Sequence, residues 1–332
     1  MAEAQVQPRK LPYVSAITDG VREVLKEQAN AFVIGEDVAG AGSVYGYYRG
    51  LLKEFGPDRI YDTPISEEGL MGLGVGAAAT GCRPIVDLMF MDFMGECMDE
   101  IANQLAKMRY MFGGHARLPV TVLTMAGAGA SLAAQHSQSL EAWLCHIPGL
   151  KVVMPSTPYD AKGLIIAAAR DDNPVFVVLN KLILGMTGEV PEGAYEIPLG
   201  QANVVRSGRN YTIVAMGRMV HEALKAADQL KALDIDAEVI DPRTLQPFDT
   251  ETVVESVKKT HRALIVHEAV RTGGLGAEIA ARIQEEAFDY LDAPVARVGA
   301  PFSPVPFSPA LEAHYVPNAE RIVAEAKKQL GL

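Results

Sequence analysis

Two adjacent carboxylates, Glu67 and Glu68, stand at the start of an apolar, glycine-rich stretch that runs to Gly81. Apolar surroundings penalise the charged form of a carboxyl group, so a carboxyl placed there can exchange a proton with a buried ring nitrogen near neutral pH. The same residues also suit a structural role, in which Ser66 caps a helix and the acids face the positive end of its dipole. Residues 62–69 alone leave both interpretations open.

His136 and Glu36 are further candidates for proton transfer. His136 follows a predicted strand at 120–125 and a glycine-rich loop at 126–130, and Glu36 directly follows a predicted strand at 32–35. Functional residues often lie at the carboxyl ends of parallel strands, and imidazole titrates near neutral pH. A loop histidine that only makes local hydrogen bonds, and an acid that only caps a loop, are the structural alternatives.

Large apolar side chains end the strand that we predict at 84–90. Met89 and Phe93 are two of them, and they suit either core packing or a hydrophobic wall against a flat ring. Residues 74–79 match a loose dinucleotide fingerprint, but they lie inside a helical pattern instead of a strand-to-helix turn. Close helix packing is therefore the better interpretation of those glycines.

Short apolar runs alternate with amphipathic helical stretches along the whole chain, which predicts mostly parallel sheets covered on both faces. Further predicted strands lie at 151–154, 175–179, 211–215, 237–240, 263–266 and 295–298, and further helices lie near 219–233, 249–259, 275–288 and 319–330. Residues 185–195 are rich in turn formers and read as a linker. We predict an α/β fold with two doubly wound domains, 1–190 and 205–332.

The composition restricts the class of partner. The formal net charge is -11, which disfavours nucleic acid and anionic membrane surfaces. Cys82, Cys97 and Cys145 are far apart and form no CxxC pair, as expected for thiols in a reducing compartment. Residues 1–10 lack the apolar core of a signal peptide, so we expect a cytoplasmic protein.

Several separated motifs resemble one known family, the beta subunit of the thiamine-diphosphate-dependent dehydrogenase component of 2-oxo acid dehydrogenase complexes. They lie at 35–37, 59–69, 81–85, 133–138, 148–153 and 160–164. The segments 88–94, 107–114 and 304–309 look most like those of acetoin dehydrogenase beta subunits. The resemblance covers nearly the whole chain in order.

The resemblance implies a pyrimidine-binding domain followed by a transketolase C-terminal-like domain. It also implies a heterotetramer of two alpha and two beta subunits, with thiamine diphosphate between them. The alpha subunit would carry the Gly-Asp-Gly motif that holds magnesium and the diphosphate, and this chain has no such motif. A lipoyl domain of a dihydrolipoyl acyltransferase would receive the acyl group.

Matched by motif, Glu67 corresponds to the carboxylate that bonds the aminopyrimidine ring nitrogen, although a slip of one residue would give Glu68. Phe93 and Met89 would line the pyrimidine pocket, His136 would lie near the reacting carbon, and Glu36 would take part in a proton relay. The resemblance also suggests a potassium ion held by backbone carbonyls. Those carbonyls would belong to Val120, Ala168, Ala169, Asp171 and Asn173.

The leading hypothesis is a catalytic subunit that, with its alpha partner, cleaves a carbon–carbon bond of acetoin and passes the acyl group to a lipoyl domain. A pyruvate or branched-chain 2-oxo acid dehydrogenase beta subunit is the nearest alternative. Two further alternatives are a split transketolase and a subunit that only assembles the complex.

Overall fold

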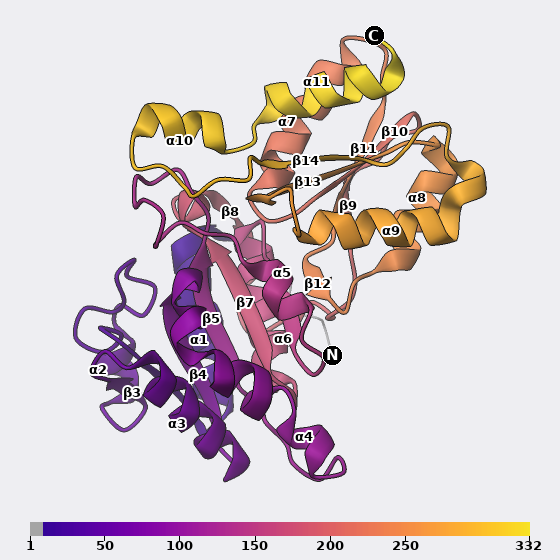
Figure 1. The fold of residues 1–332 in the computed structure, drawn as a ribbon. Coiled ribbons are helices and arrows are strands. Elements are labelled where there is room, and N and C mark those ends of the chain that lie inside the picture. The colour runs from indigo at the N-terminus through magenta and orange to yellow at the C-terminus, as the bar shows by residue number, and fades with distance from the viewer. Residues whose placement is uncertain (1–8) are drawn as a thin grey trace, which may run out of the picture. The chain divides into compact units, whose positions relative to one another are not determined.

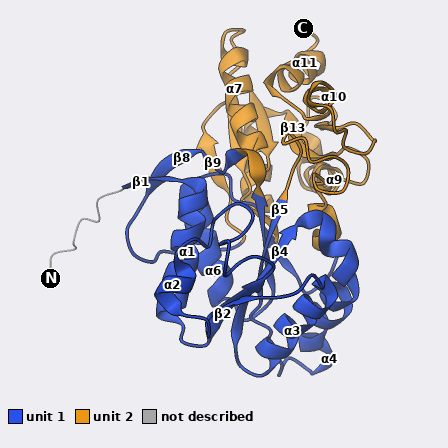
Figure 2. Cartoon of the chain, turned by 90° about the vertical axis from the view of Figure 1, so that its left-hand side faces the viewer, with its two compact units in different colours: residues 1–125, 146–179, 183–199 blue, residues 126–145, 180–182, 200–332 orange. Residues whose placement is uncertain are grey.

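The computed structural model describes residues 9–332, which pack as two compact units (Figure 2). Unit 1 comprises the residues up to Met125, together with His146–Leu179 and Ile183–Leu199. Unit 2 comprises Ala126–Cys145, Asn180–Leu182 and Gly200–Leu332. The expectation about a signal peptide rests mainly on residues 1–8, which lie outside the described residues.

Unit 1 is built on a parallel sheet with the strand order β6-β7-β5-β4-β2-β3. The strands are β2 (Ala31–Gly35), β3 (Ile60–Asp62), β4 (Arg83–Phe90), β5 (Thr121–Ala126), β6 (Lys151–Val153) and β7 (Val175–Asn180). Every residue of β5 and β7 is buried, which explains why most of their residues are apolar. A separate antiparallel pair joins β1 (Arg9–Pro12) to β8 (Thr187–Val190).

Helices cover the sheet of unit 1 (Figure 1). The main ones are α1 (Tyr13–Glu27), α3 (Glu67–Ala79) and α6 (Pro158–Arg170), and shorter ones are α2 (Leu51–Phe55) and α4 (Met108–Met111). Helix α1 packs against α6, and α3 packs against β4. The hydroxyl of Thr157 caps α6 by accepting from the backbone N–H of Asp160 at 3.1 Å.

Unit 2 has its own sheet with the strand order β14-β13-β10-β11-β9. Its strands are β9 (Asn203–Arg206), β10 (Tyr211–Ala215), β11 (Ala237–Asp241), β13 (Ala263–Val270) and β14 (Ala296–Ala300), with the short strand β12 at Thr244–Gln246. Its helices are α5 (Glu141–Cys145), α7 (Met219–Lys231), α8 (Thr250–Thr260), α9 (Leu275–Ala287), α10 (Pro309–Tyr315) and α11 (Ala319–Leu330). Neighbouring strands are parallel except at the edge, where β9 runs antiparallel to β11.

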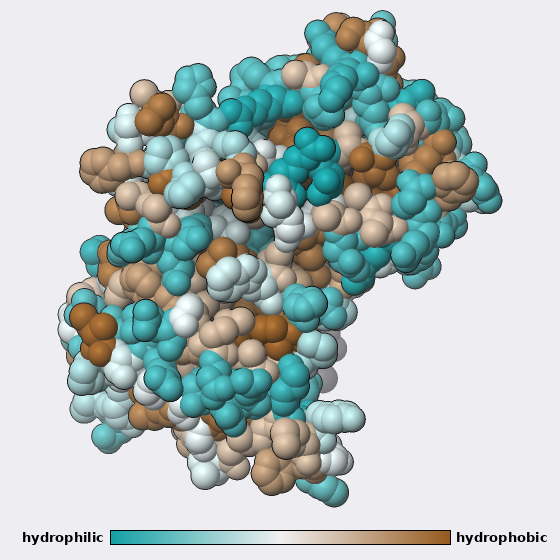
Figure 3. Space-filling view, in the orientation of Figure 1, coloured by the Kyte–Doolittle hydropathy of each residue, from teal (hydrophilic) through white to brown (hydrophobic). Residues whose placement is uncertain are grey.

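The predicted α/β alternation is confirmed, and the differences from it are local. Met94, Met98, Ile101, Leu105 and Met108 have helical spacing in the sequence, and this segment forms a 3₁₀ helix (Met91–Cys97) followed by a π-helix (Glu100–Leu105). Periodicity alone does not distinguish these helix types from an α-helix. Hydrophilic and hydrophobic residues intermingle on the face shown in Figure 3. Among residues 9–332, every helix is too short or too polar to cross a bilayer.

Candidate active site

The two carboxylates at the start of α3 have different surroundings. Glu67 is the first residue of the helix and is half-buried, whereas Glu68 is exposed. The charge of Glu67 acts on Glu36 and on the Cys97 thiol, while the charge of Glu68 acts on Glu100. Glu67 therefore lies close to the residue that follows β2, and Glu68 faces the neighbouring π-helix.

Glu36 and Glu67 meet because of the sheet. Strands β2 and β3 are parallel, with Gly35 opposite Asp62, so the chain that leaves β3 passes beside Glu36. The backbone of Ser66 hydrogen-bonds to the Glu36 carboxylate, but burial and then the charge of Glu67 raise the pKa of Glu36. The buried Oε1 atom of Glu36 has no hydrogen-bond partner among residues 9–332. The pair thus favours retention of a proton and offers an acceptor to a donor from a ligand.

A buried acid, Asp87, shapes the end of β4. Its Oδ1 accepts from the Met89 N–H at 2.7 Å, and its Oδ2 accepts from the Tyr47 hydroxyl at 2.6 Å. Met89 has a φ of 52°, and the register of β4 against β5 shifts between Asp87 and Phe90. Burial raises the pKa of Asp87 to about 6. Asp87 therefore holds Met89 in a left-handed backbone conformation that redirects the chain as the strand ends.

Aromatic rings follow this bend. The Phe93 ring, on the 3₁₀ helix, packs edge-on against Phe90 with the ring centroids 5.5 Å apart. Phe90 in turn packs edge-on against Tyr45 at 6.1 Å. Phe90 is buried, whereas Phe93 and Tyr45 keep part of their surface exposed. The exposed part of Phe93 can pack on a further flat ring.

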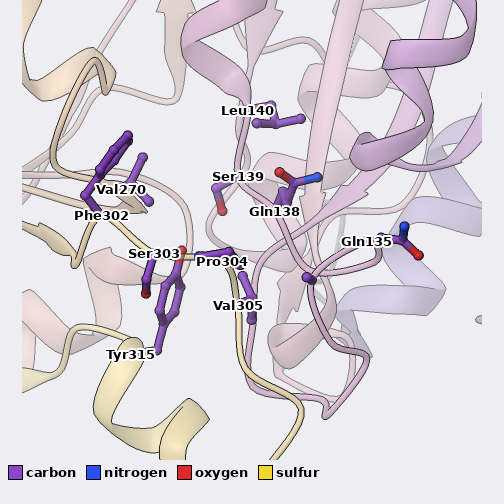
Figure 4. A pocket seen from close by; sticks show the side chains of 11 residues that line it. Gln135, Gln138, Ser139, Leu140, Val270, Phe302, Ser303, Pro304, Val305 and Tyr315 are labelled. Carbon is purple, nitrogen blue, oxygen red and sulfur yellow. The ribbon is translucent and has the colours of Figure 1, made fainter.

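His136 lies in unit 2, on the irregular segment that leads from the end of β5 to α5. It is half-buried, and the ammonium of Lys181 donates a hydrogen bond to its backbone carbonyl. A pocket of about 520 Å³ adjoins this segment (Figure 4). Its walls are Ala134, Gln135, Gln138, Ser139, Leu140, Val270, Phe302, Ser303, Pro304, Val305 and Tyr315.

The structure thus gathers four of the predicted site residues in unit 1. Glu36 and Glu67 interact through their charges, and Asp87, which fixes Met89, also acts on Glu36. The fourth is Phe93, whose carbonyl accepts a hydrogen bond from the Cys97 thiol. Burial, and then the charge of Glu67, raise the pKa of that thiol. His136, the fifth predicted residue, belongs to unit 2.

Comparison with known proteins divides the chain differently, since His136 falls within the same family match as the four residues of unit 1. Residues 9–186 match the family described as transketolase, pyrimidine binding domain, and residues 200–322 match the family described as transketolase, C-terminal domain. The acetoin:2,6-dichlorophenolindophenol oxidoreductase subunit beta of Bacillus subtilis is 48% identical, over 97% of this chain and 98% of that protein. The chain belongs to the family of dehydrogenase beta subunits.

Other members of this beta-subunit family also match this chain over nearly its whole length. The acetoin:2,6-dichlorophenolindophenol oxidoreductase subunit beta of Cupriavidus necator is 48% identical over 97% of this chain and 98% of its own length. The pyruvate dehydrogenase E1 component subunit beta of Bacillus subtilis is 45% identical over 97% and 99%. A solved structure described as "Split gene transketolase, inactive beta4 tetramer" is 27% identical with a TM-score of 0.80, and the match covers 97% of this chain and 99% of that one.

The potassium ion predicted for this beta subunit can be tested against the hydrogen bonds of the carbonyls. The Arg83 guanidinium donates to the carbonyls of Ala169 and Asp171, at 3.0 and 3.1 Å, and the Val175 N–H donates to that of Val120 at 3.0 Å. The Asp171 N–H also donates to the carbonyl of Ala168 at 3.2 Å, so four of the five carbonyls are already paired, two of them with a cationic side chain. Potassium at this place stays a prediction.

Sequence reasoning on this beta subunit missed Asp87 and Tyr47. Asp87 lies inside an apolar run, and Tyr47 lies in an aromatic segment, residues 45–49, whose residue types suit a mobile lid and ordinary packing alike. Tyr47 and Tyr48 are fully buried, so this part of the segment is packing. A lone acid within a buried strand was the available signal, because such an acid needs buried partners.

Proposed function

We propose that this chain is the catalytic beta subunit of a thiamine-diphosphate-dependent dehydrogenase. With an alpha subunit, it cleaves the carbon–carbon bond of acetoin and transfers the acyl group to a lipoyl domain. The observation that carries the proposal is the charge interaction between Glu36, which follows β2, and Glu67, the first residue of α3, within the segment that matches the pyrimidine binding domain. Relatives named for acetoin, at 48% identity, favour that substrate over pyruvate, at 45%.

The residues of unit 1 fit an aminopyrimidine ring. Glu67 is half-buried and can share a proton with a ring nitrogen, and the unpartnered Oε1 of Glu36 offers a second acceptor. Met89 and the exposed part of Phe93 provide apolar surface for the flat ring. When bound, thiamine diphosphate supplies a nucleophilic carbon that cleaves bonds next to a carbonyl.

The role of Glu67 follows from its neighbour. Burial, and then repulsion from the charge of Glu67, raise the pKa of Glu36, so Glu36 favours its protonated form beside Glu67. A carboxyl that retains its proton can donate it to a ring nitrogen, and this donation changes which nitrogen of the ring acts as a base. Glu68 is exposed, and its charge acts on Glu100 on the neighbouring π-helix. We therefore assign the proton transfer to the ring nitrogen to Glu67.

His136 is assigned the proton transfers nearer the acyl group. Its imidazole lies on a loop beside a pocket whose walls are mainly apolar, and such surroundings exclude water from a reactive acyl group. An imidazole exchanges protons at neutral pH, so it can serve either the substrate or the accepting thiol.

An alpha subunit completes the proposal. Among residues 9–332, no group of three or more His, Cys, Asp or Glu side chains could hold a metal ion, so magnesium and the diphosphate are assigned to the partner. The structural relative described as an inactive beta4 tetramer is in line with a beta chain that needs a partner for activity. That relative also keeps a split transketolase as the second candidate function.

Dye-linked turnover of this chain tests the proposal, after reconstitution with the alpha subunit encoded beside it. Thiamine diphosphate and magnesium would be present, and acetoin, pyruvate and a branched-chain 2-oxo acid would be compared. We expect turnover with acetoin to exceed that with either acid at least tenfold. Absence of turnover with all three, in a complex that has formed, would favour the split transketolase or the assembly subunit.

A further inference from the structure

Three backbone N–H groups of the loop that carries His136 donate to two buried acids of unit 2. The N–H of Ala128 donates to Glu268 Oε1 at 2.6 Å. The N–H groups of Gly129 and Ser131 donate to Glu312 at 2.5 and 2.9 Å. Glu268 and Glu312 are 4% and 2% exposed. This irregular segment is thus held by side chains instead of by secondary structure.

Through Asn180, at the end of β7, Glu268 is also linked to the part of the loop around His136. Its Oε2 accepts from the Asn180 side-chain amide at 3.0 Å, and Asn180 Oδ1 accepts from the Leu182 N–H at 3.0 Å. Between these two residues, Lys181 donates to the carbonyl of His136. The carboxylate of Glu268 therefore accepts hydrogen bonds both from the start of the loop and from the segment that donates to the His136 carbonyl.

The chain is shaped to bring Glu268 this close. A Cβ at Gly127 would lie 2.5 Å from Asn180 Nδ2 and 2.8 Å from Glu268 Oε1, and the φ of Gly127 is 97°. Only glycine fits there without displacing the two side chains. Arg218 Nη1 lies 3.9 Å from Glu268 Oε2 and partly balances its buried charge.

We propose that Glu268 is a positioning residue for His136, which it holds through the Ala128 N–H and through the Asn180–Lys181 segment. The inference rests on the proposed function, since that gives His136 its chemical task. Glu268 does not touch the reacting atoms. It fixes where the imidazole stands, and a displacement of about 1 Å can cost about 100-fold in rate.

The substitution Glu268→Gln tests this at nearly constant size. Both carboxylate oxygens accept hydrogen bonds, so an amide leaves either Ala128 or Asn180 facing another donor. The Asn180 side-chain amide cannot flip to compensate, because its oxygen accepts a hydrogen bond from the Leu182 N–H. In the alpha–beta complex, we expect faster hydrogen exchange over residues 126–139 and a roughly tenfold lower kcat with the KM for acetoin within twofold.

The double variant Glu268→Gln/Asn180→Asp provides the rescue. The introduced amide can accept from Ala128 and donate to the introduced carboxylate, whose second oxygen still accepts from Leu182. We expect slow exchange of the loop and most of the kcat to return. Recovery would show that the hydrogen bonds between residues 128, 180 and 268 hold the loop, and the control below separates this role from a general loss of stability.

Glu238→Gln is the matched control. Glu238 is also 4% exposed in unit 2, and it accepts from Lys259 at 2.5 Å and from the Gly208 N–H at 3.2 Å, outside the loop. We expect a comparable fall in Tm with kcat within twofold of the wild type. An equal loss of kcat in this control would overturn the positioning role.

The remaining outcomes separate the two proposals. Unchanged exchange over 126–139 in Glu268→Gln, or failure of the double variant to recover, overturns the role of Glu268. Faster hydrogen exchange in Glu268→Gln that the double variant reverses supports the role of Glu268. Normal turnover of His136→Gln would count only against the task assigned to His136. If Glu268→Gln does not fold, recovery of folding and turnover in the double variant supports the inference.

Discussion

Glu36 and Glu268 are acids at the carboxyl ends of parallel strands in different units, and they differ in how their oxygens are satisfied. Burial raises the pKa of both. Glu36 keeps a buried oxygen without a partner and faces the like charge of Glu67. Both oxygens of Glu268 accept hydrogen bonds, and Arg218 faces it with the opposite charge. An unsatisfied, repelled acid is suited to meet a ligand, whereas a satisfied one is suited to hold the chain.

The largest expected effect breaks the acid pair of unit 1. Glu67→Gln removes the carboxyl that shares a proton with the ring nitrogen, so kcat should fall by about 1,000-fold or more. Steady-state turnover of the complex measures this, and size-exclusion chromatography checks assembly. Glu68→Gln, the neighbouring exposed acid, should retain kcat within about threefold. Equal losses in both variants would contradict the choice of Glu67.

A smaller effect is expected from Glu36→Gln. The substitution removes one acid of the proposed proton relay, so kcat should fall roughly tenfold. Burial and then repulsion from Glu67 raise the pKa of Glu36, so loss of this group should also move the acidic limb of the kcat profile to lower pH. Asp58→Asn, at an exposed position of unit 1, is the control. A profile that stays in place would show that the two acids act independently.

Gly127→Ala probes the crowding around Glu268 in unit 2. Strain at positive φ and contacts of 2.5 and 2.8 Å should together lower the free energy of unfolding by about 2–3 kcal/mol. Gly273→Ala is the control, since Gly273 has a φ of 67° and no neighbouring atom within 4 Å of the place that a methyl group would take. It should lose only about 1 kcal/mol. Urea unfolding measures both, and equal losses would mean that the crowding carries no cost.

The smallest expected effect concerns Glu141, a buried acid of α5 whose Oε2 has no partner among the described residues. Burial, and then the charge of Glu268, raise its pKa to about 7. The native state therefore holds a proton between roughly pH 4.5 and 7 that the unfolded state releases, so this contribution to stability falls as the pH rises.

Urea unfolding at pH 5.5 and pH 8 measures that contribution. The wild type should lose about 1–2 kcal/mol more than Glu141→Gln over this interval. Glu285→Gln, at an exposed position of α9, should follow the wild type. An identical change in the free energy of unfolding between the two pH values, for the wild type and for Glu141→Gln, would mean that Glu141 is ionised in the native state.

The sequence predicted the fold better than it predicted the supports of the site. Strands such as β7 are recognisable because residues 175–179 form a continuous apolar run. Glu67 and His136 were predicted from local motifs, and their roles stay predictions. Glu268 was missed because its partners lie far along the chain, 140 residues away at Ala128 and 88 at Asn180. A local pattern carries no record of such distant pairing.

The path of the chain between the units has a practical consequence for protein engineering. Residues 126–145 and 180–182 pack with unit 2, although unit 1 flanks them on both sides in the sequence. A single cut near residue 200 would therefore separate both segments from the unit with which they pack. Chimaeras between related subunits should exchange these two inserts together with residues 200–332, and otherwise each hybrid would inherit a mismatched loop.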